Sequence, residues 1–275
     1  VALWQGQEES QGNLILYLQD NRLNLEDLNE NINKITYNNC EIFLLNTKEI
    51  STLKKYSKLK TNNKIKNVKQ IDKENVVNEI NKIIREIESK TIIIAKDIQN
   101  IKTNDFIEQM LGFVQRGNVG VISPRIIYKN LSLQYNGTVY GIDKDKTGYL
   151  DYLDTAGSFG YITRGAVVEN YSIIKSECIM VSKENLEKVN YLDEEMDYED
   201  AFANLAFELF KNHNLLNIIN PHIELETLDL TKKSGENNFY KKWKEYLKVP
   251  DPNYNINLKF EKNNLFKIKQ EKVGK

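Results

Sequence analysis

Glycine and proline are missing from long stretches of this chain. No glycine occurs between Gly12 and Gly112, and no proline precedes Pro124. A P-loop and a dinucleotide-binding fingerprint both need glycines where the backbone approaches a phosphate. The first half of the chain therefore holds neither motif, and a nucleotide bound there must be held by side chains and by a metal ion.

Cysteine and histidine are scarce as well. With only His213 and His222 in the chain, a zinc site is not expected. Cys40 and Cys178 are far apart and close to predicted strands, so we expect two buried free thiols in a reducing cytoplasm rather than a disulfide. A nucleophilic Cys–His pair is the minor alternative.

An excess of one charge and long apolar runs are also lacking. The 38 basic and 39 acidic residues leave a net charge of −1, which argues against nucleic acid as a partner. No apolar run reaches the roughly 18 residues of a membrane-spanning helix, and the polar start has no signal-peptide pattern. Because the chain begins with Val1 rather than with methionine, we expect either a trimmed chain or a piece of a longer protein.

The hydrophobic pattern of the first 122 residues alternates between strands and helices. It predicts strands at 14–17, 41–45, 91–95 and 119–122, and helices at 25–35, 76–87 and 105–115. Segment 91–95 is apolar throughout, as expected for a parallel strand buried on both faces, and Ser123-Pro124 is predicted to end the strand at 119–122. This alternation predicts an α/β fold.

The rest of the chain changes character. Short strands and glycine turns are predicted from 123 to 181, and Ser182 is predicted to cap a short helix. A cluster of carboxylates at 193–200 then leads into a helix whose apolar residues recur at helical spacing from Phe202 to Phe210. A carboxylate at such a loop-to-helix junction can serve as a catalytic base.

Several motifs stand in a characteristic order along this second half. They are Gly-Val-Ile-Ser-Pro-Arg-Ile-Ile-Tyr at 120–128, Leu-Gln-Tyr-Asn-Gly at 133–137, Cys-Ile-Met-Val-Ser-Lys-Glu at 178–184, Tyr-Leu-Asp-Glu at 191–194, Glu-Asp at 199–200 and Asp-Pro-Asn-Tyr-Asn-Ile-Asn-Leu at 251–258. This order resembles glycosyltransferase family 2, specifically its bacterial polysaccharide and rhamnosyltransferase-like branch. The resemblance implies a GT-A (Rossmann-like) fold, an α/β three-layer sandwich with a mixed, mostly parallel central sheet. It also implies an inverting transfer from a nucleotide-sugar donor.

The resemblance assigns the proton transfer to the carboxylate cluster. Asp200 matches the aspartate of the family's Glu-Asp motif, the general base that deprotonates the acceptor hydroxyl, and Glu199 is its partner. Inversion needs such a carboxylate on the sugar face opposite the leaving nucleotide. The structural alternative is that Asp197 caps the helix and Asp200 is only an acid in its first turn.

The family's Asp-x-Asp metal motif falls at Ala95-Lys96-Asp97. Asp97 matches its last aspartate, whereas Ala95 replaces the first. The resemblance implies a divalent metal, Mg²⁺ or Mn²⁺, held by Asp97 against the donor diphosphate, with Lys96 offsetting phosphate charge. The alternative for Asp97 is an acid in the turn after a strand.

The nucleotide-base site departs further from the family pattern. The turn after the first strand reads Gln19-Asp20-Asn21, and Asn46 stands where the family has an aspartate that grips the base. An amide can still hydrogen-bond a pyrimidine, with less discrimination than a carboxylate. Together with Lys96, these are the predicted nucleotide-binding residues.

Glu177 and Trp243 complete the candidate site as predicted acceptor contacts. Glu177 directly precedes the strand at 178–181, where the family has small residues, and Trp243 lies in the helix before Asp251. For Trp243, packing in the core is an equal alternative to stacking on the acceptor.

We therefore expect a flexible segment at 1–12, a GT-A domain at 13–258 and a basic amphipathic tail at 259–275. Residues 13–115 form its nucleotide-binding half, and residues 116–258 form its acceptor and catalytic half. The expected partners are a UDP-, GDP- or dTDP-linked sugar and a glycan, lipid-linked or protein acceptor. The tail is expected to pack on its own or a partner domain, or to touch the inner face of the cytoplasmic membrane.

The alternative function is a catalytically inactive glycosyltransferase-like domain that binds ligands or serves as a scaffold within a larger glycosylation protein. The altered nucleotide-binding residues of the first half favour this alternative. Nucleotide binding and turnover distinguish the two. A different nucleotide-dependent α/β enzyme is the remaining alternative.

Overall fold

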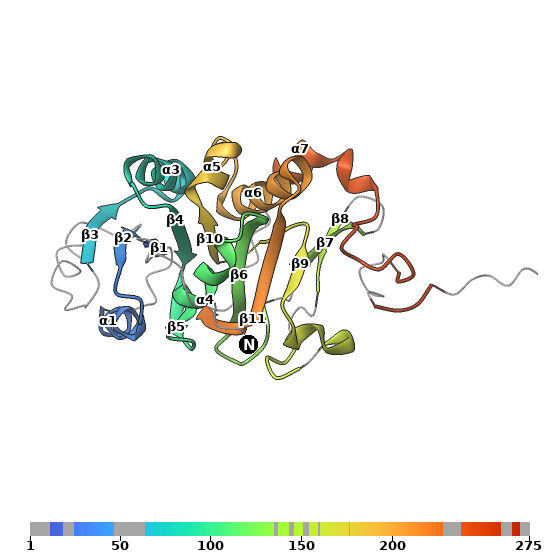
Figure 1. The fold of residues 1–275 in the computed structure, drawn as a ribbon, viewed down its shortest axis with the longest axis horizontal. Coiled ribbons are helices and arrows are strands. Elements are labelled where there is room, and N and C mark those ends of the chain that lie inside the picture. The colour runs from blue at the N-terminus through green and yellow to red at the C-terminus, as the bar shows by residue number, and fades with distance from the viewer. Residues whose placement is uncertain are drawn as a thin grey trace, which may run out of the picture.

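A central nine-stranded sheet organises the protein (Figure 1). The computed structural model describes residues 12–18, 25–46, 64–134, 137–142, 146–150, 154–158, 160–175, 177–227, 238–259 and 266–269. The predicted segment 1–12 lies outside these residues except for Gly12, which begins the first strand.

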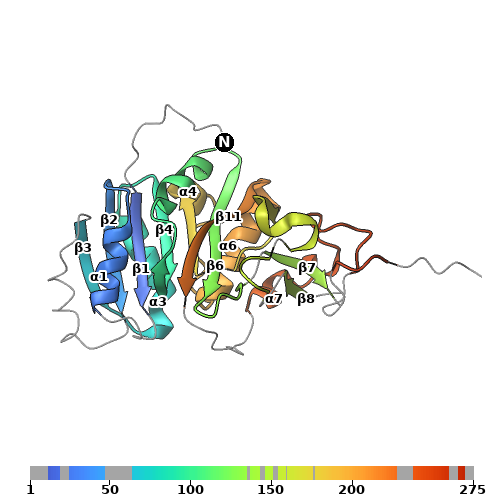
Figure 2. The same ribbon diagram turned by 90° about the horizontal axis from the view of Figure 1, so that it is seen from below.

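The sheet is mixed, with both parallel and antiparallel strand pairs. Its order is β3 (Lys64–Gln70), β2 (Cys40–Asn46), β1 (Gly12–Leu18), β4 (Thr91–Lys96), β10 (Cys178–Ser182), β6 (Val119–Tyr128), β11 (Leu216–Thr227) and β5 (Ile98–Ile101), and β9 (Glu169–Tyr171) pairs with β11. The antiparallel strand β10 lies between two sets of parallel strands, and β5 and β9 pair antiparallel to β11. Figure 2 shows β3, β2, β1 and β4 following one another from one edge. Strand β10 runs antiparallel to both β4 and β6, so it joins the first and second halves of the chain.

Helices cover both faces of the sheet. The 3₁₀ turn η1 (Lys73–Asn75) leads into α3 (Val76–Glu86), which lies on one face with α5 (Lys183–Lys188) and α6 (Tyr198–His213). On the other face are α1 (Leu25–Lys34) and α4 (Phe106–Val114). The predicted three-layer α/β sandwich is therefore confirmed.

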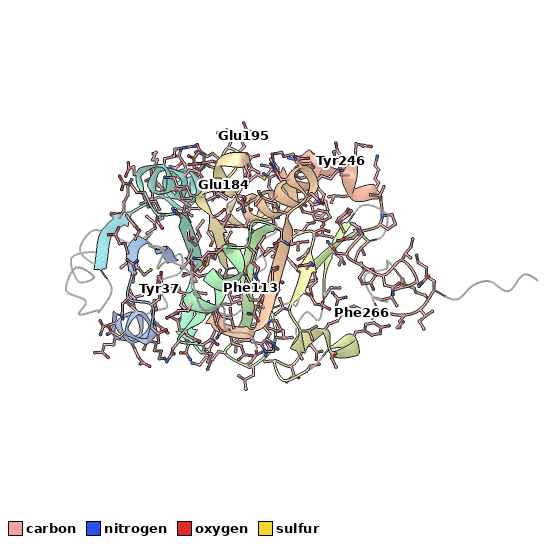
Figure 3. All side chains as sticks on the ribbon, in the orientation of Figure 1. Tyr37, Phe113, Glu184, Glu195, Tyr246 and Phe266 are labelled. Atoms are coloured by element: carbon pink, nitrogen blue, oxygen red, sulfur yellow. The ribbon has the colours of Figure 1, made fainter. Side chains whose placement is uncertain are left out.

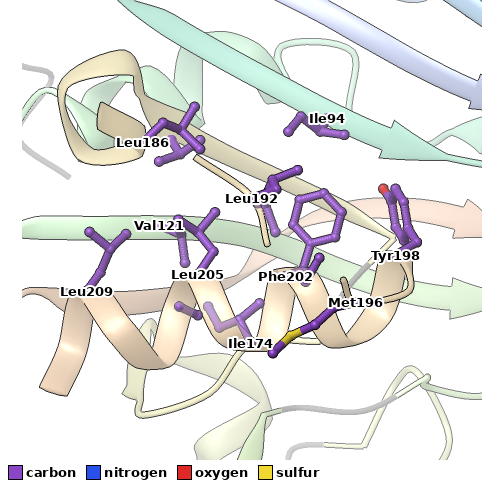
Figure 4. Close-up of a cluster of buried hydrophobic side chains, with 14 of the residues drawn as sticks. Ile94, Val121, Ile174, Leu186, Leu192, Met196, Tyr198, Phe202, Leu205 and Leu209 are labelled. Carbon is purple, nitrogen blue, oxygen red and sulfur yellow. The ribbon is translucent and has the colours of Figure 1, made fainter. Parts of the chain in front are cut away.

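The period-2 alternation of strand β4 divides the core between these two faces. Ile92 and Ile94 pack in the cluster under α3 and α6, whereas Ile93 and Ala95 pack in the cluster that includes α1 and α4. All six residues of β4 are buried, as its continuous apolar run predicted. Figure 4 shows Ile94 facing the α6 residues Phe202 and Leu205 across this core.

Smaller elements pack against the second half of the sheet. Strands β7 (Thr138–Ile142) and β8 (Lys146–Tyr149) form a separate two-stranded sheet, and 3₁₀ turns occur at η2 (Tyr161–Ala166) and η3 (Tyr246–Lys248). Helix α7 (Asn238–Trp243) packs on α6 through Phe207, Phe239 and Trp243. These aromatic contacts fix α7 against the middle of α6.

The predicted end of one strand is wrong. Ser123-Pro124 was expected to end the strand at 119–122, but β6 continues to Tyr128. Proline cannot donate to a ladder and is tolerated at irregular points of a sheet. Pro124 is paired with Asn220 directly beside the register shift in β11 between Asn220 and Glu224, so the strand passes through it.

The described part of the tail packs on its own domain. The Phe266 ring stacks on Tyr161 with centroids 4.8 Å apart, and Leu258 and Ile268 form an isolated antiparallel bridge. Figure 3 labels Phe266 beside η2. Of the expectations for the tail, packing on its own domain is therefore the one that residues 266–269 follow.

A buried carboxylate, Asp251, anchors the chain just before this tail. Its oxygens accept hydrogen bonds from the Ser172 hydroxyl at 2.6 Å, the Asn253 N–H at 2.9 Å and the Tyr140 N–H at 3.2 Å. Burial raises its pKa to about 6, even though these hydrogen bonds lower it.

We predict that Asp251→Asn removes part of the pH dependence of stability. A raised pKa means that the folded chain binds the proton more tightly, so this stability is present at low pH. It is lost as the pH rises from about 3.8 through about 6, by up to roughly 3 kcal/mol. The free energy of unfolding in urea, measured from pH 3.5 to 8, should fall more steeply for the wild type than for the variant. Parallel curves would contradict this.

Asn81 on α3 holds the segment that leads to the carboxylate cluster. Its fully buried amide donates to the Leu192 carbonyl at 2.8 Å and accepts from the Leu192 N–H at 3.1 Å. The same amide group donates to the Glu194 carboxylate at 2.8 Å. These hydrogen bonds fix the loop that connects α5 to α6.

We predict that Asn81→Ala destabilises the fold by about 2 to 4 kcal/mol, because it leaves the buried N–H and C=O of Leu192 without partners. Urea unfolding at pH 7 measures this loss. The matched control is Asn212→Ala, at an exposed position of α6, which should change stability by less than about 0.5 kcal/mol. Equal losses in the two variants would refute the role of Asn81.

Candidate functional site

The candidate site lies where β4 ends and β10 begins. The Lys96 N–H donates to the Glu177 carbonyl at 2.7 Å, and Ala95 pairs with Cys178 in the next register position. Side chains alternate along a strand, so Lys96 shares the face of Ile94, and Glu177 shares that of Ile179. Both of these apolar residues pack on the α6 face of the sheet, which directs the two charged side chains toward α6.

Helix α6 brings the predicted catalytic pair to this edge. The Asp197 carboxylate accepts from the Asp200 N–H at 2.9 Å, so the predicted N-cap is confirmed. The Lys96 ammonium lies 4.0 Å from a Glu199 oxygen and 5.3 Å from the Tyr198 ring centroid. The sequence-predicted residues Lys96 and Glu199 are therefore neighbours.

Asp200 is already engaged on both of its carboxylate oxygens. Oδ1 lies 3.4 Å from the Lys175 ammonium, and Oδ2 accepts from the Phe239 N–H at 3.2 Å. The Lys175 and Asp200 side chains are only 10% and 6% exposed. They form a buried ion pair, whose attraction must offset the cost of removing both charges from water.

Sequence reasoning did not identify Lys175 as a site residue. Its partner is 25 positions away, and no local pattern links the two. The one signal in the sequence is that Lys175 and Glu177 are charged at positions where the family has small residues.

Glu177 contributes a carboxyl group of different character. Burial, with a smaller contribution from the charge of Glu199, raises its pKa to about 7, even though Lys96 and a hydrogen bond from Gln134 lower it. Its Oε2 atom is buried and has no hydrogen-bond partner among the described residues. A carboxyl group whose pKa is close to 7 is present in both its protonated and its ionised form at neutral pH, so it can give or accept a proton.

Asp97 directly follows β4 with a left-handed backbone, at φ 47°. Aspartate is one of the few residue types that adopts this conformation readily. Its carbonyl accepts from the Thr227 hydroxyl at 3.3 Å and the Gln99 amide at 3.2 Å, and the residue is 8% exposed. These contacts tie the turn after β4 to β11.

The acidic residues at this edge do not form a complete metal cage. Among the described residues, no group of three or more histidine, cysteine, aspartate or glutamate side chains could hold a metal ion. Mg²⁺ and similar ions often bind through one or two carboxylates together with substrate phosphates. Asp97 fits that arrangement, in which a metal needs the donor's diphosphate as a further ligand.

The strands that precede the predicted nucleotide-binding residues end at the same edge of the sheet. Leu18 pairs with Asn46, and Tyr17 pairs with Lys96, so the ends of β1, β2 and β4 lie side by side. Gln19, Asp20 and Asn21 follow β1 but lie outside the described residues, as does the Asn46 side chain.

Trp243 has the contacts of a core residue. Its ring packs edge-on against Phe207 with centroids 4.9 Å apart, and its indole N–H donates to the Asn204 side chain at 2.8 Å. The residue is 7% exposed, so its surroundings are those expected for packing in the core. The acceptor contact stays a prediction.

Two further expectations concern the whole chain. Cys40 and Cys178 are both buried and neither forms a disulfide, as predicted. Within the described ranges, no helix combines the length and apolar character needed to cross a bilayer.

Comparison with solved structures identifies the fold. The mannosyltransferase PcManGT from Pyrobaculum calidifontis, in complex with GDP-Man and Mn²⁺, aligns with a TM-score of 0.56, covering 87% of this chain and 63% of its own at 12% identity. GalNAc-T7 with UDP, GalNAc and Mn²⁺ aligns with a TM-score of 0.60, covering 81% of this chain and 44% of its own at 10% identity. The fold is GT-A. At these identities the likeness extends to the fold alone.

Sequence comparison adds one relative. The uncharacterized protein y4gI of Sinorhizobium fredii (strain NBRC 101917 / NGR234) is 23% identical over 196 residues, which cover 66% of this chain. The chain spans 21% of that protein's length, and less than two thirds of either solved glycosyltransferase. No family model matches the chain.

The buried ion pair of the GT-A site is testable through stability. We predict that Lys175→Met costs about 3 to 5 kcal/mol, because it strands the buried Asp200 charge. The double variant with Asp200→Asn should recover part of that loss, which a double-mutant cycle in urea measures as coupling. Lys188→Met, which removes a lysine from an exposed ion pair with Glu184, is the control and should change little. Purely additive losses would show that the pair is not coupled.

Proposed function

We propose that this chain is a glycosyltransferase domain that moves a sugar from a nucleoside-diphosphate donor to an acceptor hydroxyl with inversion. The observation that carries the proposal is the meeting of Lys96, Asp97 and Glu177 with the acidic first turn of α6, at the strand edge of a GT-A fold. In open α/β sheets, ligands bind outside the carboxyl ends of the strands.

The donor's diphosphate belongs beside Asp97 and Lys96. The Lys96 ammonium can neutralise phosphate charge, and Asp97 can hold a divalent metal that the diphosphate also binds. The metal would stabilise the charge that develops on the leaving diphosphate. The ends of β1 and β2 lie along the same edge, and we assign the nucleoside to Asn46 and to Gln19, Asp20 and Asn21, which follow β1 in the sequence.

The acceptor side belongs to the carboxylates near α6. The family resemblance assigns Asp200 as the base and Glu199 as its partner, with Glu177 and Trp243 as acceptor contacts. We take the acceptor to be a glycan, a lipid-linked sugar or a protein, within the bacterial polysaccharide branch of family 2. A cytoplasmic location gives access to UDP-, GDP- or dTDP-linked sugars.

One observation favours the second candidate, an inactive glycosyltransferase-like domain in a larger glycosylation protein. Lys96 faces Glu199 and Lys175 faces Asp200, so the site neutralises its own charges within the described residues. Such a domain would bind a nucleotide or glycan without turnover.

We predict that UDP, GDP or dTDP raises the melting temperature only when Mn²⁺ is also present. Ligand at 100 times its Kd stabilises the folded state by about 2.7 kcal/mol, which corresponds to a shift of several degrees for a chain of this size. Mn²⁺ alone should give no shift, because Asp97 provides too few ligands without the phosphates.

Asp97→Asn should abolish the metal-dependent part of this shift. The matched control is Asp72→Asn, an exposed aspartate on the loop before η1, which should leave the shift unchanged. If no nucleotide stabilises the wild-type chain in either condition, the transferase proposal fails. If nucleotides bind but no nucleotide sugar is turned over, the inactive alternative holds.

A further inference from the structure

We propose that Lys175 keeps Asp200 closed to the acceptor, so that the chain rests in an inhibited state which this lysine must leave before transfer. The inference rests on the proposed transferase function, with Asp200 as the base. In that reaction the acceptor oxygen bonds to the anomeric carbon, and the bond from that carbon to the phosphate oxygen breaks. The nucleoside diphosphate leaves with the electron pair, and the hydroxyl proton passes to Asp200.

The Asp200 carboxylate is covered from two sides. Its Oδ1 atom lies 3.4 Å from the Lys175 ammonium, and its Oδ2 atom accepts from the Phe239 N–H at 3.2 Å. The Asp200 side chain is 6% exposed, whereas the side chain of Glu199 in the same turn is 47% exposed. An acceptor hydroxyl has to reach a carboxylate oxygen before it can give up its proton. One of the two covering groups therefore has to move.

Helix α7, which carries Phe239, is fixed in place by its packing. Phe239 is fully buried, and its ring lies edge-on to that of Phe207 with centroids 5.8 Å apart. Trp243 of the same helix donates to the Asn204 side chain at 2.8 Å. Moving α7 away would break this bond and expose the aromatic rings to water, which opposes such a movement.

Lys175 can leave Asp200 without any movement of the backbone. A flexible four-carbon stem carries its ammonium, which lies 5.6 Å from the centroid of the Phe239 ring. The preceding residues Ile173 and Ile174 are fully buried and hold the segment in place. Rotation of the lysine side chain therefore uncovers Oδ1 of Asp200 while the fold stays intact.

The lysine is a departure from the pattern that this chain otherwise resembles, because the family has small residues at this point. A small residue would leave Asp200 open, whereas the Lys175 ammonium covers it. In a buried ion pair each charge depends on its partner, so breaking the Lys175–Asp200 pair destabilises the fold. We therefore expect stability and activity to oppose each other at position 175.

The test compares the wild type with Lys175→Ser, which introduces a small residue, and Lys175→Met, which removes the charge. The donor is UDP-glucose, GDP-mannose or dTDP-rhamnose, chosen by the nucleotide that stabilises the wild type with Mn²⁺, and water is the acceptor. Release of nucleoside diphosphate gives the rate. A minor state is populated at about 0.1 to 10%, so both variants should raise kcat/KM about 10- to 1,000-fold.

The same variants should be less stable than the wild type in urea. Lys175→Ser leaves room for water beside the Asp200 charge, so it provides a folded variant if Lys175→Met does not fold. Rates are compared at a temperature at which circular dichroism shows every variant to be folded. Each variant should keep the nucleotide-dependent melting shift, which separates a change at the base from a change in donor binding.

Two controls test whether the gain passes through Asp200. The double variant of Lys175→Ser with Asp200→Asn should lose the gain, because the uncovered base is then absent. Lys242→Met removes a lysine of α7 that pairs with Asp193 at 3.1 Å, away from Asp200. It should leave the rate unchanged, which shows that loosening α7 is not the cause.

A purely structural lysine would give lower stability and a lower rate together in both Lys175 variants, and that result overturns the inference. An equal gain in Lys242→Met, or a gain that persists in the double variant, overturns it as well. A wild type without turnover whose Lys175 variants release nucleoside diphosphate supports it, whereas no release from any variant that binds nucleotide refutes it. Absence of nucleotide binding in every chain refutes instead the transferase function itself, so the two failures are distinguishable.

Discussion

The pairing of β10 with the end of β4 is the interaction on which the rest of the site depends. One antiparallel strand from the second half of the chain enters between two sets of parallel strands. A backbone hydrogen bond just before it, from Lys96 to Glu177, joins the proposed donor side of the site to the proposed acceptor side. Without that register, Lys96 and Glu177 would not lie side by side at this edge of the sheet.

The same pairing explains why the core and the site are continuous. Strand β10 leads through the Ser182 cap into α5, and the loop after α5 is held to α3 by the Asn81 amide. The core residues under α6 therefore fix the helix whose first turn carries Asp197, Glu199 and Asp200. Packing, rather than local propensity, positions these acids within reach of β4.

The sequence was sufficient for features that arise from local periodicity. The buried strand at 91–95, the amphipathic helix at 76–87 and the Asp197 cap follow from residues near one another in the chain, and the structure contains all three. The passage of β6 through Pro124 could not be predicted in this way, because it depends on the irregular partner strand β11. The strand β3 at 64–70 also lacks a clear apolar pattern, since it lies at the sheet edge.

The site shows the same division between local and long-range information. Motif order identified Glu199 and Asp200 as residues of interest, but motif order carries no information about what their side chains touch. The Lys175–Asp200 pair, and the burial of a Glu177 oxygen that has no hydrogen-bond partner among the described residues, arise from segments that only the fold brings together. A carboxylate that holds two donors and one that holds none on its buried oxygen are chemically different groups, whatever their places in a motif. Motif order therefore indicates which carboxylates to consider, whereas the burial and the partners of each carboxylate follow only from the packing of distant segments.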